Sequence, residues 1–108
     1  MSAPTATLTA WHWPADVLNF AAQHQVGAYL DPMLHATGRL FPTAGSVRVF
    51  LESDPELRDE WHIVFEVHVH KADVPKYLEA RHQWTAELFR ICPAPLVCNF
   101  CLSLLRMA

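Results

Sequence analysis

Apolar residues along the chain recur first at the spacing of helices. From Pro14 to Gln25 they fall on one helical face, and Pro14 suits the first turn of a helix because it has no N–H to leave unpaired. A second helical pattern runs on to Phe41 but is interrupted by glycine and proline. This second helix begins either with the apolar pattern at Val26 or at Pro32, where Asp31 would be the N-cap. The pattern therefore predicts two consecutive helices.

From Ser46 the spacing changes to the alternation of strands. One strand starts at Ser46, charged residues between Ser53 and Asp59 predict a turn, and Glu60 to His70 alternates again, so the two runs predict a β-hairpin. The expected core face of the second strand carries Trp61, Ile63, Phe65, Val67 and Val69. Its opposite face carries His62, Val64, Glu66, His68 and His70.

The last third of the chain predicts one long helix and one strand. Asp73 is a good N-cap residue, and apolar residues at helical spacing follow from Val74 to about Ile91. The Cys92-Pro93-Ala94-Pro95 segment ends the helix, since a residue before proline avoids the α region, and a strand is expected over Leu96 to Leu105.

The predicted element order is α-α-β-β-α-β, which favours an α+β fold. We expect a two-layer sandwich with the helices packed on one face of a small, mainly antiparallel sheet. Four side chains are expected to be buried together: Val47, Trp61, Phe65 and Trp84. Residues 1–10 predict a flexible N-terminal arm, and residues 11–108 a single domain.

Composition narrows the classes of function. The chain has 108 residues, 52% of them hydrophobic, and a formal net charge of −3, so it lacks the basic field that draws in nucleic acid. No apolar stretch approaches the roughly 20 residues of a membrane span, and the first residues do not resemble a signal peptide. Three cysteines, an odd number, favour reduced thiols in the cytoplasm and no disulfide.

A metal site is one candidate for chemistry. Glu66, His68 and His70 are potential ligands at alternate strand positions, with neighbouring Cα atoms about 6.6 Å apart. Cys101 would be a further ligand if its strand lay on the same face, and zinc or another divalent transition metal would suit this set. The alternative is that these side chains belong to a solvated or interfacial face of an amphipathic strand, and that no cofactor is bound.

Other catalytic motifs are weak. Cys98 and Cys101 have the spacing of a redox pair, but in a strand their sulfurs would point to opposite faces, and Cys98 is expected to be a core thiol beside Phe100. With three glycines the chain has no phosphate-binding loop, and it contains no Gly-x-Ser-x-Gly elbow. Nucleotide-driven chemistry and serine-hydrolase chemistry are not expected.

The sheet face away from the helices is more apolar than a fully hydrated face needs to be. We expect a partner to cover some of it, with interface residues Phe50, His62, Val64, Val97 and Leu105. The leading hypothesis is a small cytoplasmic, non-enzymatic protein–protein interaction or regulatory module that forms a homodimer. The alternative is a divalent-metal protein or small metalloenzyme that uses Glu66, His68 and His70.

Overall fold

The computed structural model describes residues 12–53, 56 and 60–107, so the expected arm over residues 1–10 lies outside it. The main helices are α2 (Ala15–Gln23), α3 (Leu30–Leu40) and α4 (Val74–Ile91), and the strands are β1 (Ser46–Ser53), β2 (Trp61–His70) and β3 (Phe100–Met107). Short 3-10 helices are η1 (Gly27–Tyr29), η2 (Lys71–Asp73) and η3 (Ala94–Asn99). The predicted order α-α-β-β-α-β is confirmed, and none of the described helices is both long and apolar enough to cross a membrane.

The three strands form one mixed sheet in the order β1-β2-β3. β1 and β2 form the predicted antiparallel hairpin, in which Phe50 lies opposite Val64. β3 pairs with the other side of β2 in parallel, which places Cys101 opposite Val64. Parallel neighbours need a long crossover connection, and α4 is that connection.

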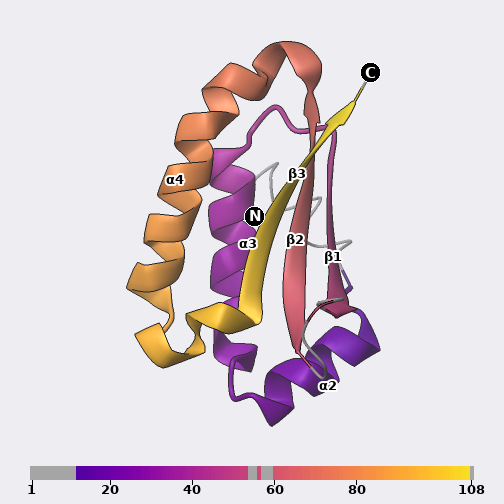
Figure 1. Cartoon of the computed structure of the whole chain (residues 1–108), viewed down its shortest axis with the longest axis vertical. Helices are drawn as coiled ribbons and strands as arrows, with labels where there is room; N and C mark the ends of the chain where they lie inside the picture. Colours follow the sequence, from indigo (N-terminus) through magenta and orange to yellow (C-terminus); the bar gives the residue numbers. More distant parts are fainter. Residues whose placement is uncertain (1–11, 54–55, 57–59, 108) are drawn as a thin grey trace.

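The helices and the sheet form the two predicted layers. Figure 1 shows α3 and α4 side by side on one side of the sheet, with α2 across the lower ends of the strands. Alternate residues of β2, from Ile63 to Val69, point into the helix layer and are fully buried. The α+β two-layer architecture is therefore confirmed.

Phe65 is the centre of the core. Its ring lies 5.9 Å from that of Trp84 on α4 and 6.3 Å from the rings of Trp13 and Phe100, measured between centroids. Trp13 also donates its indole N–H to Asp31, at 2.9 Å. Aromatic residues from four parts of the chain thus meet over the central strand, each pair adding to the area they bury.

The starts of α3 and α4 differ in part from what the sequence predicted. α3 begins at Leu30, so Asp31 lies in its first turn, where a carboxylate favours the helix dipole, and does not cap it. Asp73 holds the N-cap position of α4 as predicted, but its side chain makes no capping hydrogen bond. The positions of the helices were therefore predictable to within a few residues, while their capping contacts were not.

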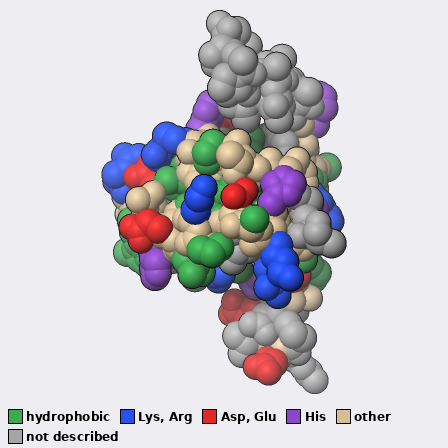
Figure 2. Space-filling model, turned by 90° about the horizontal axis from the view of Figure 1, so that it is seen from above, with side chains coloured by type: hydrophobic (Ala, Val, Ile, Leu, Met, Phe, Trp, Pro, Cys, Tyr) green, Lys and Arg blue, Asp and Glu red, His purple; other side chains and the backbone are tan. Residues whose placement is uncertain are grey.

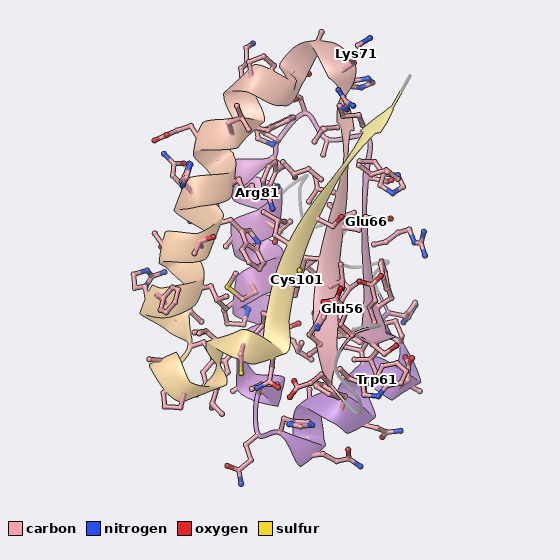
Figure 3. All side chains as sticks on the ribbon, viewed as in Figure 1. Glu56, Trp61, Glu66, Lys71, Arg81 and Cys101 are labelled. Atoms are coloured by element: carbon pink, nitrogen blue, oxygen red, sulfur yellow. The ribbon has the colours of Figure 1, made fainter. Side chains whose placement is uncertain are left out.

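Trp61 is not buried with Phe65 and Trp84 as expected, because 48% of its surface is exposed. It has the same strand parity as the buried residues of β2, but it is the first residue of that strand and lies at its end (Figure 3). Alternation predicts which side a residue points to, whereas burial also depends on how far the helix layer extends.

The strand expected from Leu96 begins only at Phe100, and η3 takes the preceding residues. Proline suits the first helical positions, and the N–H of Leu96 bonds to the carbonyl of Pro93 at 2.8 Å. Cys98 consequently lies in η3 and is exposed, so its expected place in the core is wrong. The buried thiol is that of Cys92, at the C-terminal end of α4.

Candidate functional site

The sheet face turned away from α3 and α4, here called the outer face, holds most of the predicted site residues. Because strand residues alternate between faces, one register brings every second residue of the three strands together. The outer face comprises Ser46, Arg48, Phe50, Glu52, His62, Val64, Glu66, His68, His70, Cys101, Ser103 and Leu105. Its predicted histidine and carboxylate residues are therefore on one surface, as the alternation indicated.

A connected set of polar side chains crosses β1 and β2 on this face. Glu66 accepts from Arg48 at 3.4 Å and is 2.8 Å from Nε2 of His68. Nδ1 of His68 lies 3.0 Å from the hydroxyl oxygen of Ser46. Only 15% of the Glu66 side chain is exposed (Figure 3 labels it), so this carboxylate is held between two basic groups rather than in open water.

The order Ser46, His68, Glu66 is that of a serine–histidine–carboxylate chain. If Nε2 of His68 donates to Glu66, Nδ1 accepts from Ser46, which is the polarity of a general base. Hydrolytic catalysis also needs donors aimed at a developing oxyanion. The backbone of β2 around Glu66 and His68 is paired on both sides, with β1 and with β3, and two cavities in the described part of the molecule are lined by other residues. The three hydrogen-bonded side chains thus hold one another in place on the outer face, and neither cavity offers them a site for a substrate carbonyl.

A second histidine–carboxylate contact and an apolar row complete the outer face. Glu52 and His62, opposite each other on β1 and β2, approach to 3.9 Å. Between this pair and Glu66 lies the row of Phe50, Val64 and Cys101. Arg48, 5.1 Å from the centroid of the Phe50 ring, connects the polar and the apolar parts.

The proposed metal ligands are only partly brought together. Glu66 and His68 are adjacent, and His70 is two residues further along the same strand. Cys101 lies opposite Val64 and not opposite His68, a separation of about 13 Å along the strands. Among the described residues, no group of three or more His, Cys, Asp or Glu side chains is arranged to hold a metal ion. The metal site stays a prediction with two neighbouring ligands.

The proposed interface residues differ in how much surface they offer. Leu105 is 48% exposed, whereas Phe50 and His62 are partly buried. Val64 is only 2% exposed, so it supports its neighbours and has little surface left for a partner. Val97 was placed on this face by the predicted strand; it lies in η3 instead and is packed against the core.

The three cysteines are free thiols in three different environments. Burial raises the pKa of the Cys101 thiol, the negative charge of Glu52 raises it further, and Arg81 opposes both. Burial also raises the pKa of Cys92. A raised pKa means less thiolate at neutral pH, which is the opposite of the activation that redox cysteines require.

A groove between α4 and β3 was not anticipated from the sequence. Its volume is about 320 Å³, and it is lined by Arg81, Trp84, Thr85, Leu88, Phe89, Val97, Phe100, Cys101 and Leu102. The sequence does contain a trace of it, because the α4 members recur three to four residues apart, as one helical face does. That spacing alone cannot distinguish a face packed in the core from one beside a groove.

Charged groups of both signs are distributed over the surface. Figure 2 shows basic, acidic and histidine side chains interspersed on the end seen from above, without a large area of one sign.

No protein family, no curated protein and no solved structure matches this chain. Function is therefore inferred from its own residues and their geometry.

Proposed function

We propose that this protein is a non-enzymatic protein–protein interaction module that forms a homodimer through the outer face of its sheet. An accessory or regulatory role in the cytoplasm suits such a module, and three free thiols suit a reducing compartment. The alternative of a divalent-metal protein rests on the adjacent pair Glu66 and His68 and is the second candidate.

The observation that carries the proposal is the pairing of charges around an apolar row. Glu66 is held by Arg48 and His68, and Glu52 lies beside His62. A face whose carboxylates each lie beside a basic group can meet its own copy with reduced like-charge repulsion. Phe50 and Leu105 contribute apolar surface that a second copy would remove from water.

The second copy is favoured as the occupant because a twofold interface presents the same patch from both sides. A strongly acidic or basic partner would gain little from a face that carries its own counter-charges. A partly apolar surface of strands, whose carboxylates already have basic neighbours, is the kind that two identical chains share.

The test is the mass of the protein in solution measured by sedimentation velocity over about 1 to 100 μM. The natural chain is expected to approach a dimer, and Leu105→Glu to remain a monomer, because a charge would be buried in the interface without a partner. The matched control is Leu18→Glu, since Leu18 on α2 is 45% exposed and lies outside the outer face.

A monomeric natural chain at the highest concentration would overturn the proposal. So would an equal effect of Leu105→Glu and Leu18→Glu on the dimer. Circular dichroism of both variants establishes that the fold is retained, so that loss of the dimer is not confused with unfolding.

A further inference from the structure

β3 is an edge strand with a free side. It pairs with β2 only, so alternate N–H and C=O groups of its backbone point away from the sheet. The N–H of Phe100 bonds to the carbonyl of Val97 in η3; within residues 12–53, 56 and 60–107, no other backbone hydrogen bond from outside the sheet reaches Phe100–Met107. An unpaired edge of this kind is a template for another strand.

The groove described above runs along this free edge. Three consecutive residues of β3, Phe100, Cys101 and Leu102, line it. Successive strand residues point to opposite faces, so only a cavity at the edge of the strand can contact all three. The opposite wall is α4, with Arg81 and Cys101 on the two facing elements (Figure 3).

The lining of the groove is apolar except for Thr85 and one cation. Trp84 and Leu88 form its buried base, and Phe89 is 57% exposed at its rim. Arg81 is the charged residue of the lining, and none of the ion pairs between described residues involves its guanidinium. Arg90 on the same helix, by contrast, is held by Glu87 at 2.8 Å.

We propose that this groove binds an extended, acidic–apolar peptide segment of a partner protein, which adds a fourth strand beside β3. Backbone hydrogen bonds to the edge would hold the segment, and apolar side chains at alternate positions would enter the groove. An Asp or Glu of the segment would pair with Arg81, where a carboxylate gains a charge-assisted hydrogen bond.

A second copy of β3 is a poorer occupant, because that strand contains no Asp or Glu and its charged residue is Arg106. The groove residues of α4 also do not belong to the outer face. Of the groove lining, Cys101 alone also belongs to the outer face, so peptide binding and homodimer formation otherwise involve different side chains, and either can fail without the other.

The probe is a displayed library of random dodecapeptides selected on the complete natural protein. Enriched peptides are expected to alternate apolar residues with at least one Asp or Glu. The best of them, synthesised with a fluorophore, is expected to lose at least tenfold in affinity on Phe89→Ala and on Arg81→Gln. Matched controls are Leu78→Ala, since Leu78 is an equally exposed apolar residue of α4, and Lys76→Gln; less than a twofold change is expected for both.

Methylation of alternate backbone nitrogens in the peptide tests strand addition directly. One of the two registers of methylation is expected to abolish binding, because it blocks the N–H groups that face β3. Equal binding of both methylated peptides overturns the proposal. So does the failure to enrich any peptide, the enrichment of basic peptides, or equal losses with the matched controls.

Discussion

The indole N–H of Trp84 donates a 2.8 Å hydrogen bond to the hydroxyl of Thr37, a residue 47 positions earlier in the chain. The same hydroxyl donates to the carbonyl of Met33 at 2.6 Å, so Thr37 joins α3 to α4 inside the core. Both Thr37 and Trp84 are buried, at 0% and 2% exposure. The indole of Trp84 and the hydroxyl of Thr37 are thus satisfied within the helix layer rather than by water.

Thr37→Val should destabilise the fold by about 1 to 3 kcal/mol, because the Trp84 indole would be left without an acceptor in the core. The free energy of unfolding in urea measures this cost. Thr85→Val is the matched control: its hydroxyl is also bonded to a carbonyl of its own helix, but it is exposed, and a much smaller change is expected. Equal costs for the two variants would contradict the role given to Thr37.

Thiol alkylation should be selective in the folded protein. Cys98 is exposed and is expected to react first with iodoacetamide at neutral pH. Cys92 is buried, and burial raises the pKa of both Cys92 and Cys101, so both should react only slowly until the protein unfolds. Mass spectrometry of tryptic peptides over time gives the order. Early labelling of Cys101 would show that its environment is more open than described.

Stability should fall in alkaline solution. The pKa values of Cys92 and Cys101 are raised in the folded state, so the unfolded chain loses these protons first as the pH rises past the ordinary thiol value of about 8.5. The folded state then holds more protons than the unfolded state, and the free energy of unfolding decreases with pH. Cys92→Ala combined with Cys101→Ala should flatten this slope in urea titrations at several pH values.

Ser103→Ala serves as the control for that slope, since Ser103 is a neighbouring outer-face residue that does not titrate in this range. An identical slope in the natural chain and in the double cysteine variant would mean that other groups cause the alkaline loss.

Metal content separates the two candidate functions. Zinc sites usually have three or four protein ligands, and here Glu66 and His68 are adjacent while Cys101 is several residues away along the strands. Protein purified without a histidine tag is therefore expected to contain far less than one metal ion per chain by mass spectrometry. Near-stoichiometric zinc that is lost in His68→Ala/His70→Ala would favour the metal protein instead.

Ser46 should not behave as a catalytic nucleophile, although His68 and Glu66 are aligned behind it. A hydrogen-bonded serine gains little reactivity unless donors are also aimed at a developing oxyanion, and Ser46 lines neither of the two cavities noted above. A fluorophosphonate probe is expected to leave Ser46 unlabelled. Labelling that disappears in both Ser46→Ala and His68→Ala would contradict the non-enzymatic proposal.

The sequence was informative where one periodicity decided the outcome. Alternation from Ile63 to Val69 indicated the buried face of β2, and it placed Glu66 and His68 together on the other face. It could not show that β3 joins β2 in parallel, because register depends on how far α4 returns the chain. The distance between Cys101 and His68 could therefore not be predicted from the sequence.

Competition between a 3-10 helix and a strand explains why the expected last strand begins later than predicted. Pro93 and Pro95 ended α4 as predicted, but they also favoured η3, which took Val97 and Cys98 out of the expected strand. The groove required knowing that α4 lies beside the free edge of β3. No residue spacing within either element contains that information, since it arises when two distant segments pack together.

The parallel pairing of β2 with β3 also has a kinetic consequence. The β1–β2 hairpin closes a short loop, whereas Ile63 meets Phe100 only after the whole of α4 has been traversed. Bringing distant segments together costs more chain entropy before any contact compensates it. The C-terminal strand is thus expected to dock late during folding and to leave early during unfolding, so that the central strand has one open side in the intermediate stages.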